Sequence, residues 1–172
     1  MRRTGTTRRG ALTATGAIVL GATLAGCGGD DGGDGREDST VADAQAAAAQ
    51  VENTLRLTAA TTSRKLLVQY DQVVKAHPGT QAGLAPLRDA VRAHTTALSQ
   101  GKGGTLPLSP PPATDAKAAV KDLAAAERRT ADAHTATLLK APPELARLLA
   151  SIAAAGAAHA YLLTELAKET SS

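Results

Sequence analysis

Apolar residues recur at spacings of three and four along the chain from residue 41 onward, which is the period of an α-helix with one buried face. Three breaks rich in proline and glycine divide this pattern into four stretches. The breaks are Pro78-Gly79, 101–112 and Pro142-Pro143, and the predicted helices are 41–76, 81–100, 113–140 and 143–169. Four amphipathic helices of this length are typical of a four-helix bundle, so the sequence predicts an all-α fold.

Each predicted helix carries one apolar stripe. In chain order the stripes are Val51, Leu55, Thr58, Thr62, Leu66 and Val73; Leu84, Leu87, Val91, His94 and Leu98; Val120, Ala124, Glu127, Ala131, His134 and Leu138; and Leu145, Ile152, Gly156, His159, Leu163 and Leu166. The chain has two Tyr, no Phe and no Trp. The core must therefore be formed by aliphatic side chains packed at close range.

The ends of the helices and their connectivity are less strongly specified. Ser39 or Thr40 is the expected N-cap of the first helix, and Thr114 is that of the third. The connection 101–112 ends in a proline-rich run, and its 12 residues together reach roughly 37 Å in polyproline geometry. A 20-residue helix is about 30 Å long, so this connection is long enough to cross the whole bundle. Both a simple up-and-down bundle and a crossover form agree with the sequence.

The first 27 residues have the features of an export signal. Four arginines within the first nine residues precede an uncharged stretch, 11–25, that is shorter than the roughly 20 residues of a membrane-spanning helix. The stretch runs into Leu24-Ala25-Gly26-Cys27, which resembles the lipobox of bacterial lipoproteins. In that family the Cys thiol receives a diacylglyceryl group and the chain is cleaved just before it. The resemblance implies a signal peptide over 1–26 and a lipidated Cys27.

The segment that follows Cys27 is rich in Gly and Asp and almost free of apolar residues. It cannot bury enough surface to fold, so residues 27–40 are expected to be a disordered tether and 41–172 the bundle domain. The lipid would hold the protein at the extracytoplasmic face of the cell membrane. Arg8-Arg9 is similar to a twin-arginine export motif, and the general secretion route remains the alternative.

The charge of the chain excludes one class of partner. Its formal net charge is +3, but without the four arginines of the export signal 15 basic residues stand against 16 acidic ones. No basic stripe remains to follow phosphates, and almost no aromatic side chains are present on which bases would stack. We therefore expect no nucleic-acid partner. The expected partners are the membrane and an envelope protein, and self-association is left open.

Three histidines and one carboxylate interrupt the apolar stripes. Counted from the turns of an up-and-down bundle, His94, Glu127 and His159 lie at one level within roughly 5 Å, and all three stay near mid-height in the crossover form. Two imidazoles and a carboxylate in a bundle interior are a known way to hold one divalent transition metal, such as Zn, Fe, Mn or Cu. The alternative is that each histidine is structural, exposed at a seam or hydrogen-bonded to Thr58, Thr62 or the backbone. His134 would pair with Glu127 or mark a second level.

The third and fourth helices, with Glu127 in LAAAERRTADAH and His159 in ASIAAAGAAHAYLL, resemble the ferritin-like domains of bacterial secreted proteins and lipoproteins. The resemblance covers about 41–169. The di-iron centre of that fold takes a Glu from each of two helices and Glu-x-x-His from each of the other two. His94, His159 and Glu127 match three of these ligands.

The other three ligands of the di-iron centre are missing. Val91 and Gly156 stand where each Glu-x-x-His has its Glu, and Thr58 and Thr62 stand at the expected height on the first helix. A bridged di-iron centre needs several carboxylates, so the resemblance implies a degenerate site. No other catalytic motif is present in the sequence.

The sequence therefore predicts a protein that is not an enzyme. The first hypothesis is a lipid-anchored bundle that binds a partner or supports the envelope. The second is a metal-binding or metal-storage lipoprotein with a mononuclear site at His94, Glu127 and His159. A third is a carrier that holds a small ligand in a cavity of the alanine-rich core.

Overall fold

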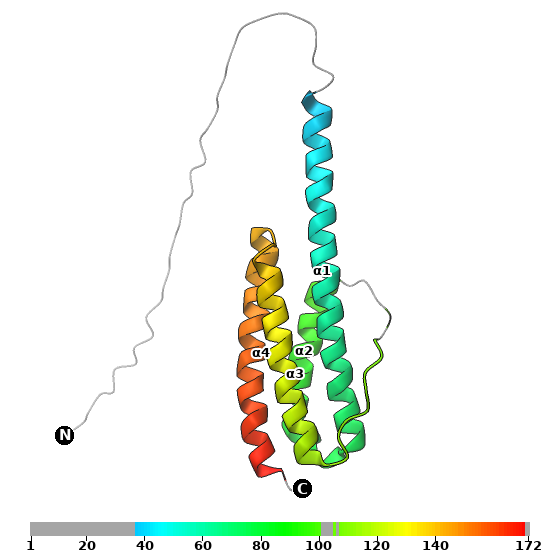
Figure 1. The fold of residues 1–172 in the computed structure, drawn as a ribbon, viewed down its shortest axis with the longest axis vertical. Coiled ribbons are helices and arrows are strands. Elements are labelled where there is room, and N and C mark those ends of the chain that lie inside the picture. Colours follow the sequence, from blue (N-terminus) through cyan, green and yellow to red (C-terminus); the bar gives the residue numbers. More distant parts are fainter. Residues whose placement is uncertain (1–36, 101–104, 106, 171–172) are drawn as a thin grey trace, which may run out of the picture. The chain divides into compact units, whose positions relative to one another are not determined.

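The computed structural model describes residues 37–100, 105 and 107–170. Within these residues the chain forms four α-helices and one short 3₁₀ helix, with no strand (Figure 1). In chain order the elements are α1 (Glu37–Ala76), η1 (Pro78–Thr80), α2 (Gln81–Ser99), α3 (Ala116–Leu138) and α4 (Pro143–Glu169). The all-α bundle predicted from the apolar pattern is confirmed for this part of the chain. The expected signal peptide, Cys27 and most of the expected tether lie outside the described residues.

The start of α1 differs from the sequence prediction. The helix begins at Glu37, so its first residues fall within the range 27–40 predicted as a tether, and Ser39 and Thr40 lie inside the helix instead of capping it. Acidic residues at a helix N-terminus are stabilised by the helix dipole, and the run of alanines that follows has the highest helix propensity. The absence of apolar residues, which argued for disorder, did not outweigh these local preferences.

The start of α3 is also corrected. Its N-cap is Asp115 and not Thr114: the Asp115 carboxylate accepts a hydrogen bond from the backbone N–H of Ala118 at 2.7 Å. A carboxylate at this position satisfies a free backbone donor and also interacts favourably with the helix dipole. The other boundaries agree with the prediction within two residues, and α4 has the predicted bounds.

The long connection between α2 and α3 returns along α1. The Gln72 side-chain amide donates to the carbonyl of Ser109 at 3.3 Å, and His77 Nε2 donates to the carbonyl of Ala113 at 2.9 Å. The proline-rich run is thereby fixed beside the last turns of α1, and α3 begins at the end of the bundle where α1 ends (Figure 1). The structure has the crossover form, and the up-and-down alternative is wrong.

This connectivity makes every packed pair of helices antiparallel. Short turns join α1 to α2 and α3 to α4, while α1 also packs on α3 and α2 also contacts α4. Two apolar clusters fill the interior. The cluster near the α1–α2 turn is built around Tyr70, Leu84, Leu123 and Leu163, and the cluster at the other end is built around Leu98, Leu145 and Leu149.

Helix α4 is the most apolar of the four. Among the described residues it is the one helix long and apolar enough to cross a membrane by length and composition. Its stripe Leu145, Leu149, Ile152 and Leu163 is buried against the other helices. In this structure the stripe of α4 therefore packs into the core of the bundle.

Candidate functional site

A buried polar cluster lies between the two apolar clusters, and Glu127 of α3 is its centre. The Tyr70 hydroxyl on α1 donates to Glu127 Oε1 at 2.7 Å, and His159 Nδ1 on α4 donates to the same oxygen at 3.0 Å. The Glu127 residue is 1% exposed. A buried carboxylate needs such partners because its desolvation is costly. The carboxylate thus ties three helices together at one point.

The remaining helix, α2, reaches this cluster through His94. Its imidazole stacks on the His159 ring, with ring centroids 6.2 Å apart and planes inclined by 15°. Burial and the neighbouring His159 lower the pKa of His94, while the Glu127 carboxylate acts in the opposite direction. Burial, the charge of Glu127 and the hydrogen bond to it raise the pKa of Tyr70, which therefore stays a neutral donor.

His134 forms a second level of the polar interior, nearer the α3–α4 turn. Its Nε2 lies 3.1 Å from the Ser63 hydroxyl of α1, while Nδ1 is buried and has no hydrogen-bond partner among the described residues. Burial, and to a lesser extent the nearby His94, lowers the pKa of His134 to about 4. The ring is therefore neutral at neutral pH, with one nitrogen unsatisfied.

The structure brings together the three residues singled out from the sequence, since Glu127 contacts His159 and His159 contacts His94. His134 is not paired with Glu127, and its partner is Ser63. The expectation that the histidines are hydrogen-bonded to Thr58 or Thr62 is wrong. Both threonine hydroxyls bond to carbonyls of their own helix, four residues earlier.

The level of the site on α1 is also corrected. Tyr70 stands opposite Glu127, where the sequence placed Thr58 and Thr62. The difference follows from the crossover, because α3 starts at the α1–α2 end of the bundle, where α1 ends, and Glu127 therefore meets a late turn of α1. The sequence did carry a signal for the missed residues: Ser63 and Tyr70 continue the Leu66 and Val73 stripe at helical spacing.

The metal hypothesis can be compared with this geometry. Among the described residues, no group of three or more His, Cys, Asp and Glu side chains is arranged to hold a metal ion. Glu127 Oε1 already accepts two hydrogen bonds, and His159 uses Nδ1 for one of them. As the side chains stand, they do not form such a set of ligands for one metal ion. The mononuclear site at His94, Glu127 and His159 stays a prediction from the sequence.

Gly156 leaves space beside the Glu127 carboxylate because it has no side chain. A Cβ added there would lie 3.3 Å from Glu127 Oε2 and 3.4 Å from the Ala131 Cβ. We expect Gly156→Val to lower the free energy of unfolding by about 1–3 kcal/mol, because its methyl groups overfill the space beside the carboxylate. Gly156→Ala is expected to change it by less than about 1 kcal/mol, since better helix propensity offsets the tight contact.

Urea unfolding measures both variants. Gly79→Ala is the matched control, because a Cβ at Gly79 would meet nothing within 4 Å. If Gly156→Val were as stable as the wild type, the close packing between α3 and α4 at Glu127 would be wrong.

Comparisons with protein-family models, with curated proteins and with solved structures find no match to this chain.

Proposed function

We propose that the chain is a lipid-anchored extracytoplasmic lipoprotein whose ferritin-like bundle is not catalytic and acts by binding a partner or supporting the cell envelope. The observation that carries the non-catalytic part is the burial of Glu127. Among the described residues it is the one buried acidic side chain, it is 1% exposed, and Tyr70 and His159 both donate to its Oε1. A general base must lie within hydrogen-bond reach of its substrate, whereas this carboxylate is enclosed in the helix bundle.

The ferritin-like assignment is supported by the connectivity. A four-helix bundle with one long crossover connection is the arrangement of ferritin-like folds. The described helices have this order, with the long connection between α2 and α3. Histidines of α2 and α4 and a glutamate of α3 meet in the interior, as in the metal-binding members of that fold. If the bundle is ferritin-like, Tyr70 stands for a first-helix carboxylate, and its hydroxyl donates to Glu127.

The lipoprotein assignment rests on Leu24-Ala25-Gly26-Cys27 and on the single cysteine of the chain. If Cys27 carries the lipid, Cys27→Ser is expected to move most of the protein from the membrane fraction to the soluble or secreted fraction, because one residue supplies the whole anchor. Fractionation and immunoblotting of cells that express the full chain measure the shift. Ser39→Ala is a control that keeps Cys27.

Three outcomes separate the parts of the proposal. Retention of Cys27→Ser in the membrane fraction would contradict the lipid anchor, and the location of the protein would then need another cause. Release of Cys27→Ser together with loss of envelope integrity, while Glu127→Gln cells stay normal, supports a binding or support role outside the buried cluster. A growth defect caused by Glu127→Gln at wild-type protein levels would instead point to chemistry at the cluster.

A further inference from the structure

A cavity lies beside the bundle, outside the buried polar cluster of Glu127. Its lining comes from three parts of the chain, which are α1, residues 109–112 of the proline-rich connection, and α3. Its volume is about 220 Å³. This is below the range of roughly 300–1,000 Å³ that holds a drug-sized molecule, so a ligand of this cavity is smaller than that.

The wall that the connection contributes is fixed in place. The Gln72 side chain donates to the carbonyl of Ser109 at 3.3 Å, and His77 Nε2 donates to the carbonyl of Ala113 at 2.9 Å. Residues 110–112 between these two points are prolines, whose rings lock the backbone angle φ. The cavity is therefore formed before a ligand arrives, and little conformational entropy is lost on binding.

The hydroxyl group of Ser109 points to a polar ligand. Its Oγ is buried and has no hydrogen-bond partner among the described residues. A buried hydroxyl without a partner is costly, and most such groups in proteins are paired. Because Ser109 lines the cavity, a polar ligand held there can supply the missing partner. The Gln69 side chain also lines the cavity and forms no hydrogen bond within the described chain.

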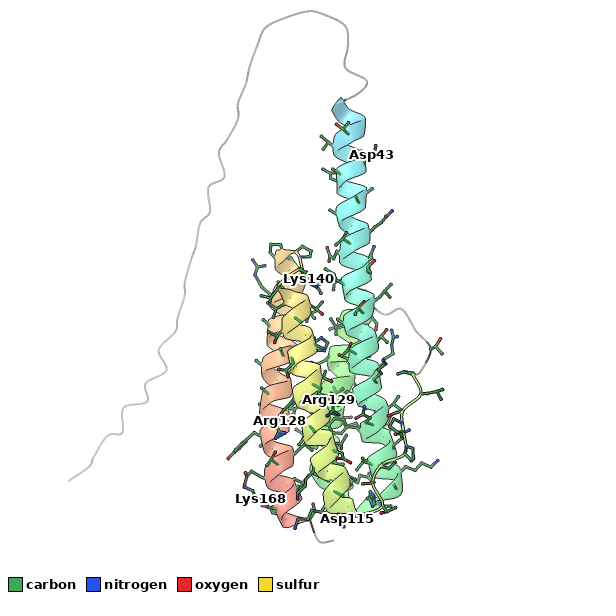
Figure 2. The ribbon with its side chains drawn as sticks, in the orientation of Figure 1. Asp43, Asp115, Arg128, Arg129, Lys140 and Lys168 are labelled. Carbon is green, nitrogen blue, oxygen red and sulfur yellow. The ribbon has the colours of Figure 1, made fainter. Side chains whose placement is uncertain are left out.

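Two charged side chains of α3, Asp122 and Arg129, complete the lining. Neither forms an ion pair or a hydrogen bond with another described residue, and both are exposed, so a ligand can reach them. They lie seven residues apart, about 10.5 Å along one face of the helix. Figure 2 shows Arg129 beside Arg128 near the middle of α3. Val73 and Leu123 give the same cavity an apolar surface. The lining thus combines two opposite charges with an apolar floor.

We propose that this cavity binds a zwitterion of dipeptide size, whose carboxylate pairs with Arg129 and whose ammonium group pairs with Asp122. An extended dipeptide spans about 7 Å at most, and the long side chain of Arg129 covers the remaining distance. A guanidinium group also matches the planar geometry of a carboxylate. Ser109 and Gln69 are available to bond to the peptide group. A single amino acid carries both charges on one carbon and is too short to reach both side chains.

Calorimetric titration with alanyl-alanine tests the proposal on the full chain carrying Cys27→Ser. We expect saturable one-to-one binding, with a dissociation constant on the order of 0.1–1 mM for a ligand with so few atoms. Alanine, N-acetyl-alanyl-alanine and alanyl-alanine amide each lack one of the two contacts and are expected to bind at least about threefold more weakly. Low ionic strength is used because salt screens such pairs. Equal affinity for alanyl-alanine and its two blocked forms, or no saturation up to about 10 mM, would overturn the proposal.

Two variants assign each charge of the ligand to its partner. Arg129→Gln is expected to raise the dissociation constant of alanyl-alanine at least about threefold and to leave that of alanyl-alanine amide unchanged, because the amide has no carboxylate. Asp122→Asn is expected to weaken alanyl-alanine similarly and to leave N-acetyl-alanyl-alanine unchanged.

The matched control is Arg128→Gln. Arg128 donates to Thr164 and does not line the cavity, so this variant is expected to bind alanyl-alanine as the wild type does. Asp122, Arg128 and Arg129 are all exposed, so the variants are expected to fold, and their melting temperatures check this. If Arg129→Gln bound alanyl-alanine like the wild type, or if Arg128→Gln weakened it equally, the assignment of the cavity would be wrong.

Discussion

Replacing Glu127 with alanine is expected to lower the free energy of unfolding by about 3–5 kcal/mol, because it leaves the Tyr70 hydroxyl and the His159 imidazole buried without their acceptor. At this size of domain, each kcal/mol corresponds to roughly 4 °C of melting temperature. Tyr70→Phe removes one hydrogen bond to a charged group and is expected to cost less, about 1.5–3 kcal/mol. Thermal and urea unfolding at pH 7.5 measure both changes.

A combined variant separates two contributions to the free energy of unfolding. One is the loss caused by leaving buried groups unpaired, and the other is the net contribution of the intact cluster. Replacing Tyr70 with Phe, Glu127 with Leu and His159 with Leu together removes every buried group that would be left unpaired. Such apolar replacements are often neutral or stabilising. We expect the triple variant to recover most of the stability that Glu127→Ala loses. A Glu127→Ala protein within 1 kcal/mol of the wild type would contradict the buried network.

Two controls keep this prediction specific. Asp132→Ala changes an exposed carboxylate of the same helix and is expected to change stability by less than about 0.5 kcal/mol. The wild type is also melted with chelator and with added Zn, Mn, Fe or Cu. Ligand that binds only the folded state raises the melting temperature. A rise with one metal that is lost in His94→Ala/His159→Ala would support the mononuclear site predicted from the sequence.

The four helices could be predicted because the apolar period and the breaks at Pro78 and Pro142 are local signals. The connectivity could not, because the connection 101–112 is long enough for both arrangements. Tertiary contacts decide the connectivity. The side chains of Gln72 and His77 donate hydrogen bonds to the backbone of the connection and fix it along α1. No spacing in the sequence reports contacts between residues that lie 36 and 37 positions apart.

The residues of the site also divide into those that the sequence predicts and those that depend on tertiary contacts. That Glu127 and His159 point inward could be predicted from their places on apolar stripes, and so could their proximity. Their partners on α1 could not, because the level at which α1 meets α3 depends on the connectivity. Counting along an up-and-down bundle pointed to the threonines of α1, whereas the crossover places Tyr70 beside Glu127. A sequence pattern gives the face of a helix more readily than the height at which it meets its neighbour.

Acidification is the second change with a large expected effect, and His134 is its main cause. Burial lowers the pKa of His134 to about 4 in the folded protein, while an unfolded chain has the ordinary value near 6.5. Between these values the unfolded state binds a proton that the folded state does not. The contribution of His134 to stability is therefore complete above pH 6.5 and is lost as the pH falls to 4. The loss amounts to about 3 kcal/mol.

The comparison that isolates this effect uses His134→Leu. Its side chain does not titrate, and the Ser63 hydroxyl is free to bond to a carbonyl of its own helix. Urea unfolding at pH 7.5, 6.5, 5.5 and 4.5 is expected to give a wild-type curve that falls more steeply than that of the variant. Some pH dependence remains in the variant, since burial also lowers the pKa of His94. Parallel curves for wild type and His134→Leu would mean that His134 can take up its proton in the folded protein, which its burial and unpartnered Nδ1 argue against.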